Sequence, residues 1–365
     1  MYNQIDTPSL IVDKGVLLNN IKKMGQLAKE HKVKLRPHIK AHKCSEIAKI
    51  QLHYGAVGVT VAKLEEARIM FDGGVNDILL ANQLVSDVKL EKLFALKKQG
   101  ALIKCLVDNL EQVKLLSSYS LKYDIPTEIY VEVDTGLKRT GLLPQDTVGF
   151  VREIMGKEGI IFSGILTHAG HVYGADKDNV PQIGQLEGTV MAEIAKELKN
   201  IDVSGFEVSV GSTPTVKYSA ANNLVTEIRP GNYVFNDAIQ VALGTAEIKN
   251  CSLKVLATVI SKPAPDRLII DAGSKTLALD KGAHGAASVK GFGIIENYPN
   301  LLLDRLSEEH GIVTVAPGNI PRLGEELYII PNHACTVVNL ADKLLVLENG
   351  KINESWTIDA RGKNK

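Results

Sequence analysis

The chain has 365 residues, of which 45% are hydrophobic and 23% charged, as in an ordinary globular protein. Lysine plus arginine and aspartate plus glutamate both number 42, so a net charge of zero indicates no nucleic-acid or membrane-surface partner. No apolar run is long enough for a membrane span, and the N-terminus lacks the pattern of a signal peptide. The cysteines at 44, 105, 251 and 335 form no CxxC pair, which predicts reduced thiols in a cytoplasmic protein.

In chain order, a short apolar strand at Ser9–Asp13 and a helix at 17–30 precede a regular alternation of strands and helices. The predicted strands are 34–36, 58–62, 77–81, 103–107, 128–133, 162–167, 206–210 and 224–228. The helical stretches that separate most of them are 45–53, 64–71, 88–98, 110–121, 147–155 and 180–198. Such alternation gives a parallel sheet, and eight repeats favour a closed (β/α)8 TIM barrel over residues 15–235. A doubly wound open sheet is the alternative.

After about residue 235 the pattern changes to short strands with turns and no long helix. The strand-like runs are 242–245, 252–260, 267–272, 291–295, 312–316, 326–330, 335–340 and 343–348, with one candidate helix at 301–309. These runs predict a second, mainly antiparallel β-domain over 236–365. Residues 1–14 are assigned to it as well, because the strand at Ser9–Asp13 has no partner in the barrel. The Lys-rich tail, 361–365, looks frayed.

A (β/α)8 barrel carries its active site at the C-terminal ends of its strands, and the first barrel strand runs into Arg36-Pro37-His38-Ile39-Lys40-Ala41-His42-Lys43. Lys40 could be desolvated there and kept partly neutral, as an amine must be to form a Schiff base. The plain alternative is a solvated basic loop. Of the flanking histidines, His38 and His42, at least one is expected to be structural.

The seventh and eighth strands end in Gly211-Ser212-Thr213-Pro214-Thr215 and Arg229-Pro230-Gly231-Asn232-Tyr233. Small residues and hydroxyls let backbone N–H groups approach an anion, and phosphate usually binds at these two loops of the barrel. Ser212, Thr213, Gly231 and Asn232 are therefore candidate phosphate ligands, although the first motif alone could be a plain turn. A phosphate anchor together with a lysine in the same cleft implies pyridoxal phosphate, PLP.

Other strand-end residues could contact the cofactor. His168 could stack on the ring or hydrogen-bond to it, or it could cap a helix. Arg139 could bind a cofactor or substrate carboxylate, or form a surface ion pair. Tyr173 could act in proton transfer, or pack within its loop. The role of the polar cluster Glu308-Glu309-His310 cannot be assigned.

The second constellation is Pro331-Asn332-His333-Ala334-Cys335 in the β-domain. If this segment is a strand, His333 and Cys335 share a face and can reach one metal ion. Imidazole and thiolate suit Zn²⁺, but two protein ligands are fewer than the three usual for catalytic zinc. Water and substrate would have to complete the coordination.

Together these motifs resemble the fold-type III PLP enzymes, specifically the D-threonine aldolase and eukaryotic-type D-serine dehydratase group related to alanine racemase. The resemblance implies that Lys40 is the Schiff-base lysine and that the seventh and eighth loops, including Tyr233, bind the cofactor. It implies that His333 and Cys335 hold a divalent metal, with Zn²⁺ favoured and Mn²⁺ as the alternative. It also implies a homodimer with active sites near the subunit interface.

Within that group a His-x-Cys motif resembles the dehydratases and a His-x-Asp motif the aldolases. Cys335 therefore favours dehydration of a D-β-hydroxy-α-amino acid such as D-serine or D-threonine to a 2-oxo acid and ammonia. D-Threonine aldolase activity, which gives glycine and acetaldehyde, is the alternative. An amino-acid racemase is a further one, since it would use the same lysine without the metal.

Overall fold

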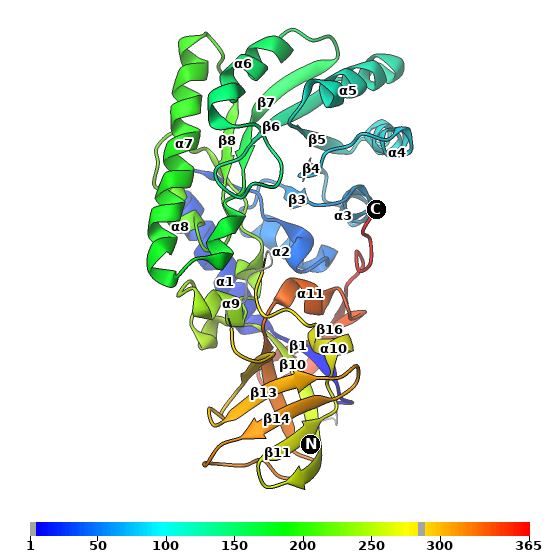
Figure 1. The fold of residues 1–365 in the computed structure, drawn as a ribbon. Helices are drawn as coiled ribbons and strands as arrows, with labels where there is room; N and C mark the ends of the chain where they lie inside the picture. The colour runs from blue at the N-terminus through cyan, green and yellow to red at the C-terminus, as the bar shows by residue number, and fades with distance from the viewer. Residues whose placement is uncertain (1–4, 284–288) are drawn as a thin grey trace.

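A computed structural model describes residues 5–283 and 289–365, which form two β-sheets, each with its own hydrophobic core. In Figure 1 the helix-covered parallel sheet lies above and the mainly antiparallel sheet below, with α9, α10 and α11 between them. The order of elements confirms the predicted (β/α)8 barrel followed by a β-domain. The exact domain boundaries at residues 14 and 235 stay predictions.

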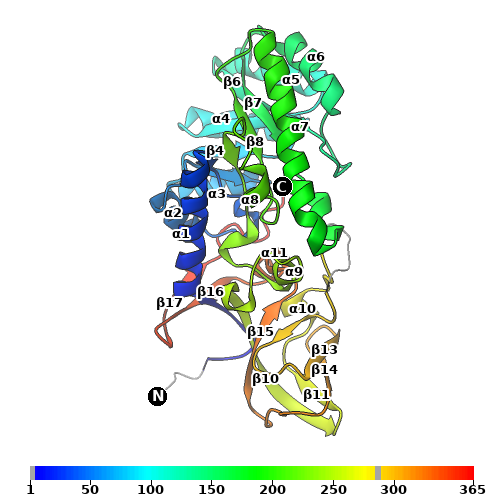
Figure 2. The same ribbon diagram turned by 90° about the vertical axis from the view of Figure 1, so that its left-hand side faces the viewer.

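The barrel contains eight parallel strands in the order β2-β9-β8-β7-β6-β5-β4-β3. The strands are β2 (Lys34–Leu35), β3 (Val59–Val61), β4 (Asp77–Leu80), β5 (Leu102–Val107), β6 (Thr127–Val133), β7 (Ile160–Thr167), β8 (Glu207–Val210) and β9 (Glu227–Ile228). The helices are α1 (Lys14–His31), α2 (Ser45–His53), α3 (Leu64–Asp72), α4 (Asp87–Lys98), α5 (Leu110–Tyr123), α6 (Pro144–Ile154), α7 (Val180–Asn200) and α8 (Val216–Ser219). Figure 2 shows α7 running along most of the barrel's height.

The two outer strands of this order, β2 and β3, are joined through residues beyond their ends. Thr60 donates its N–H to the carbonyl oxygen of Pro37 at 2.8 Å, and Val57 donates to Leu35 at 2.9 Å. A parallel bridge pairs His38 with Thr60. The ring is therefore closed by hydrogen bonds, which decides for the barrel against the open sheet.

The second sheet has nine strands with its main path in the order β13-β14-β11-β10-β1-β16-β17, and β15 and β12 branch from β10. The strands are β1 (Ser9–Asp13), β10 (Leu253–Ala264), β11 (Arg267–Ile270), β12 (Gly293–Ile295), β13 (Leu301–Leu306), β14 (Gly311–Val315), β15 (Glu326–Pro331), β16 (Lys343–Glu348) and β17 (Lys351–Thr357). As expected, β1 pairs here, antiparallel to β10 and parallel to β16.

Several short segments of the β-domain differ from the sequence prediction. The candidate helix at 301–309 is strand β13, because Leu301 and Leu303 alternate into the core opposite β14. The predicted strand at 335–340 is instead helix α11 (Ala334–Val338), and 242–245 is the end of helix α9 (Ala238–Ala242) and a turn. Strand β17 was not predicted. Such short apolar runs carry no decisive periodicity, so distant contacts select their conformation.

The C-terminal tail is bound to the barrel, contrary to the prediction that it frays. Ala360 donates its N–H to the carbonyl oxygen of Lys43 at 3.0 Å, and the carbonyl oxygen of Lys365 accepts from Glu65 at 3.2 Å. Figure 1 accordingly marks the C-terminus beside α3. None of the helices within the described ranges is both long and apolar enough to cross a membrane.

Candidate active site

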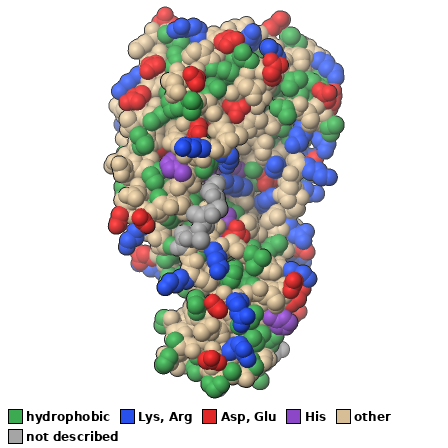
Figure 3. Space-filling model, viewed as in Figure 1, with side chains coloured by type: hydrophobic (Ala, Val, Ile, Leu, Met, Phe, Trp, Pro, Cys, Tyr) green, Lys and Arg blue, Asp and Glu red, His purple; other side chains and the backbone are tan. Residues whose placement is uncertain are grey.

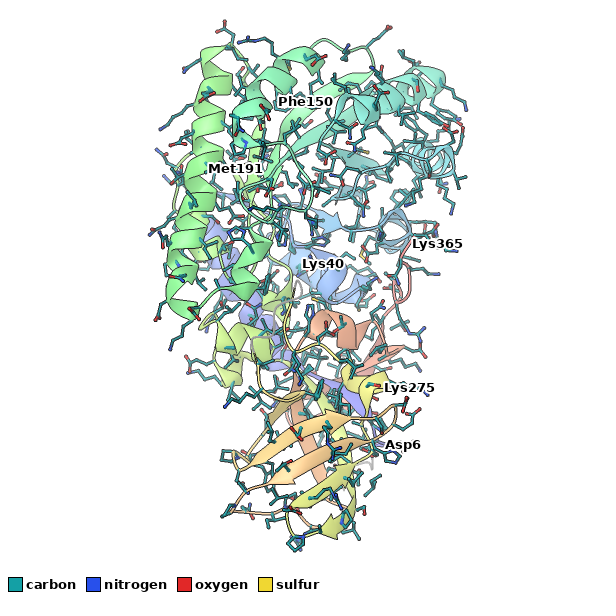
Figure 4. All side chains as sticks on the ribbon, viewed as in Figure 1. Asp6, Lys40, Phe150, Met191, Lys275 and Lys365 are labelled. Atoms are coloured by element: carbon teal, nitrogen blue, oxygen red, sulfur yellow. The ribbon has the colours of Figure 1, made fainter. Side chains whose placement is uncertain are left out.

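A cavity of 890 Å³ lies where the C-terminal ends of the barrel strands face α11. Such a volume suits a cofactor together with a small substrate. The predicted site residues that line it are Lys40, Arg139, His168, Tyr173, Ser212, Thr213, Gly231, Asn232, His333 and Cys335. Figure 3 shows a hollow at mid-height of the molecule with basic and histidine side chains around it. Figure 4 labels Lys40 near the middle of the molecule, between the barrel strands and the β-domain. The two predicted constellations therefore face one space.

Lys40 sits on a single turn of 3-10 helix, η1 (Ile39–Ala41), directly after the short strand β2. His38 caps this turn, because its Nδ1 accepts from the Lys40 N–H at 3.3 Å. Ile39 and Ala41 are fully buried on either side, so the turn is anchored while Lys40 reaches the cavity. Burial lowers the pKa of Lys40, and the nearby guanidinium groups of Arg139 and Arg229 contribute in the same direction. This environment favours the neutral, nucleophilic amine.

The two loops predicted to bind phosphate are held against each other and against the Lys40 segment. The Thr213 hydroxyl accepts from the Tyr233 N–H at 3.1 Å, which joins the loop after β8 to the loop after β9. The N–H of His38 donates to the carbonyl oxygen of Pro230 at 3.0 Å. A Cβ added to Gly231 would lie 3.1 Å from the carbonyl oxygen of His38, so this close approach favours glycine.

A buried carboxylate on α7 holds the loops that follow β7 and β8. Glu187 Oε1 accepts from the N–H of Ala169 at 3.2 Å and from the N–H of Gly211 at 3.0 Å. Gly184 and Gly188 let α7 approach closely, since an added Cβ would lie 2.8 and 2.9 Å from the backbone oxygens of Thr215 and Ser219. Burial raises the pKa of Glu187. Sequence reasoning missed this residue, because it lies in the middle of a helix and far from any strand end.

Three further predicted residues surround the cavity at different depths. His168 follows β7 and its Nδ1 lies 3.4 Å from the carbonyl oxygen of Gly211. Arg139 is about half exposed, with Nη2 3.8 Å from Oε1 of the buried Glu132. Burial raises the pKa of the Tyr173 hydroxyl, and the negative charge of Cys335 acts in the same direction. The arrangement places a cation, an imidazole and a phenol on the walls of one space.

The His333 and Cys335 pair is brought together by a helix start rather than by a strand face. His333 is the extended N-cap residue of α11, and Cys335 lies within the helix. The same-face argument from a strand is therefore wrong, yet both side chains line the cavity. Within the described residues no group of three or more His, Cys, Asp or Glu side chains is arranged to hold a metal ion. The pair therefore remains a two-ligand candidate.

The surroundings of this pair favour a positive charge. Burial lowers the pKa of His333, but the Cys335 thiolate and the Asp280 carboxylate outweigh it and raise the pKa to about 11. Asp280 Oδ1 lies 3.5 Å from His333 Nδ1. A carboxylate beside one ring nitrogen orients the other toward a metal, so the residues present fit a divalent cation.

Other predicted residues lie away from the cavity. Tyr233 is buried in the second core, and its hydroxyl accepts from Gln51 Nε2 at 3.0 Å. His42 is the structural histidine, since its ring bonds Gln51 and the Cys44 N–H and burial lowers its pKa to about 4. The cluster Glu308-Glu309-His310 lies in the exposed turn between β13 and β14, where Glu309 pairs with Lys275.

The cavity also has walls that the sequence did not reveal. Asn82 and Gln83 follow β4 and could have been found from the rule for strand ends. Lys43 lines the cavity with its ammonium group 3.0 Å from Glu66 and 3.1 Å from Asn364 of the C-terminal tail. No local signal in the tail indicates this contact, which depends on how the two domains meet.

Comparison with known proteins places two domain families on this chain. Residues 12–238 match the alanine racemase N-terminal domain, and residues 252–347 match the putative serine dehydratase domain. The chain is 33% identical to a D-threonine aldolase from an Arthrobacter species, over 98% of this chain and 93% of that protein. It is 30% identical to a D-serine dehydratase from Dictyostelium discoideum, over 97% and 98% of the two chains.

Solved structures agree with these matches. A D-threo-3-hydroxyaspartate dehydratase from Delftia sp. HT23 has a TM-score of 0.90 at 30% identity and 97% coverage of both chains. A D-threonine aldolase from Filomicrobium marinum has a TM-score of 0.89 at 29% identity, covering 99% of this chain and 96% of that one. An alanine racemase from Clostridium difficile 630, at 15% identity and a TM-score of 0.71, shares the fold.

Proposed function

Since this chain belongs to the family that joins an alanine racemase N-terminal domain to a serine dehydratase domain, we propose that it is a PLP-dependent lyase that dehydrates D-β-hydroxy-α-amino acids. The observation that carries the proposal is the meeting of Lys40, the loops after β8 and β9, and the His333–Cys335 pair at one cavity. A lysine and a phosphate site fit PLP, and a cation site fits a substrate hydroxyl.

When bound, PLP supplies an electron sink for charge on Cα, and a divalent metal supplies a Lewis acid for the β-hydroxyl. Lys40 would hold the cofactor aldehyde, and its neutral Nζ is the base positioned to accept the substrate's Cα proton. Ser212, Thr213, Gly231 and Asn232 hold the phosphate. His333 and Cys335 hold the metal, with Zn²⁺ favoured by the thiolate.

The remaining wall residues bind and orient the substrate. Arg139 is the cation that the substrate carboxylate meets, because its guanidinium lines the cavity and is half exposed toward solvent. His168 lies on the wall between the loops after β7 and β8, where it restrains the cofactor ring. Tyr173 stays a neutral phenol, because burial disfavours its ionised form.

Dehydration is favoured by Cys335, the residue that resembles the metal motif of the dehydratases. A D-threo-3-hydroxyaspartate dehydratase that is 29% identical has been solved as a mutant in a metal-free form, which supports the metal site of the proposal. A D-threonine aldolase activity is the second candidate, because a relative of that name is 33% identical over nearly the whole chain. The two activities differ in whether the Cβ–O or the Cα–Cβ bond breaks.

Product analysis tests the proposal directly. The purified protein is incubated with D-serine or D-threonine, with and without Zn²⁺ or Mn²⁺. Pyruvate or 2-oxobutyrate with ammonia is expected. Glycine with acetaldehyde from D-threonine would assign the aldolase instead, and L-serine from D-serine would assign a racemase. L-Serine and L-threonine are the matched control substrates and should give no product. The homodimer implied by the resemblance is a separate prediction, checked by the native mass in solution.

A further inference from the structure

Asp237 connects the two halves of the cavity, although it does not line it. The residue lies between η4 (Asn232–Val234) and α9, and its side chain has no solvent exposure. Oδ1 accepts from the Gln240 N–H at 3.0 Å, which caps α9. Oδ2 accepts from Asn232 Nδ2 at 2.5 Å and from the Ala334 N–H at 2.9 Å. One carboxylate therefore holds groups from three segments.

Two of these partners belong to the two proposed binding sites. Asn232 lies in the loop after β9, which lines the cavity and is the proposed phosphate site. Ala334 stands between His333 and Cys335, and its N–H is the first amide of α11. A second bond lies nearby, since Ile239 of α9 donates its N–H to the carbonyl oxygen of Asn332 at 3.3 Å. The segment that follows the phosphate loop is thus bonded at two points to the segment that carries His333 and Cys335.

We propose that Asp237 is a positioning residue for both sites, so that a single change at this position weakens cofactor and metal binding together. The inference rests on the proposed PLP and metal sites. Its physical basis is that the Ala334 N–H would lose its hydrogen-bond acceptor. The first residues of α11, which include both proposed metal ligands, would then be held less firmly. Loss of the bond to Asn232 would likewise leave the Asn232 side chain without its restraint in the phosphate loop.

The donor pattern around Asp237 decides which substitution tests the inference. All three partners are N–H donors, so both carboxylate oxygens must accept. An asparagine could turn its NH₂ group toward the Gln240 N–H and keep its oxygen for Asn232 and Ala334, so Asp237→Asn would leave both ties in place. Asp237→Ala removes both acceptor oxygens and is the variant that tests the inference.

The experiment measures two affinities on the full-length protein at a temperature where circular dichroism shows each variant folded. PLP is titrated by absorbance, and Zn²⁺ is titrated in competition with a chromophoric chelator. Asp237→Ala is expected to weaken Zn²⁺ binding by about 10- to 100-fold, as for other groups that orient metal ligands. PLP binding is expected to weaken by about tenfold, as for loss of a hydrogen bond to a charged group.

Asp271→Ala is the matched control. Asp271 also accepts a backbone N–H bond in the β-domain, from Thr258 at 2.7 Å, and neither residue lines the cavity. Both affinities should stay at the wild-type values in this variant. If Asp237→Ala left either affinity unchanged, the inference would be overturned. A wild-type protein that bound neither PLP nor Zn²⁺ would instead refute the proposed function.

A second variant decides the case in which Asp237→Ala does not fold. Asn232→Ala removes only the partner on the phosphate side and leaves the carboxylate in place. Because Asp237 Oδ2 then loses one of its two restraints, Zn²⁺ affinity should fall several-fold, although Asn232 is not a metal ligand. Wild-type Zn²⁺ affinity in a folded Asn232→Ala protein would overturn the inference.

Discussion

The backbone N–H of His38 donates to the carbonyl oxygen of Pro230 across 3.0 Å, so the turn that carries Lys40 is joined directly to the loop after β9. The spacing between the backbone of the Lys40 turn and the loop after β9 is thereby set by a backbone hydrogen bond. A cofactor held at both ends needs this fixed spacing.

Lys40→Ala should abolish the absorbance band of lysine-bound PLP and lower turnover by about 10²–10⁴-fold from loss of proton transfer alone. Lys43→Ala is the matched control, because Lys43 is a second lysine at the cavity but is paired with Glu66. Its spectrum should keep the band. The lysine assignment would be wrong if the band survived in Lys40→Ala or disappeared only in Lys43→Ala.

Removal of the metal should separate catalysis from cofactor binding. Chelation, His333→Ala or Cys335→Ser should lower activity by about 10²–10³-fold, because a Lewis acid contributes several kcal/mol. The PLP absorbance should remain. Cys251→Ser, a buried cysteine that does not line the cavity, should keep both metal and activity. Full turnover of metal-free protein would reject the metal's role.

Glu187 should contribute to stability and PLP binding by accepting hydrogen bonds, and not through a negative charge. Glu187→Gln keeps one side-chain oxygen for the Ala169 and Gly211 amides and should change PLP affinity only a few-fold. Glu187→Leu leaves both amides without that partner and should cost about 1–3 kcal/mol for each amide left unsatisfied. Thermal unfolding and PLP titration measure the two effects. Equal behaviour of the two variants would contradict the geometry.

Lys40 should also destabilise the cofactor-free protein, in a pH-dependent way. Burial lowers its pKa in the folded state below the ordinary value of 10.5. Between the lowered pKa and 10.5 the unfolded chain binds more protons, so stability rises with pH in this window. Methionine does not titrate, so Lys40→Met should have a larger free energy of unfolding than wild type at neutral pH. This difference in free energy should shrink as the pH rises toward 10.5. Denaturant unfolding of both cofactor-free proteins at several pH values measures it, and a pH-independent difference would refute the lowered pKa.

The order of strands and helices could be predicted from the sequence because each barrel unit has a clear local period. The same alternation places the loops after the strands at one edge of the barrel, and so predicts that Lys40, Ser212, Thr213 and Gly231 lie together. Parallel strands place their C-terminal ends on one side whatever the details of packing. The site residues at strand ends can therefore be predicted from the sequence.

The tertiary structure alone decided what depends on contacts between distant segments. Helix α11 begins where Asp237, almost one hundred residues earlier, accepts the Ala334 N–H, so 334–338 is not a strand. Glu187 and Asp237 carry no motif, because each acts by accepting amides from segments that are remote in sequence. The C-terminal tail reads as polar and frayed, yet Lys43 and Glu65 bind it. The local sequence pattern indicates whether a segment is a helix or a strand. The partner of a buried polar side chain depends on which distant segments the folded chain brings next to it.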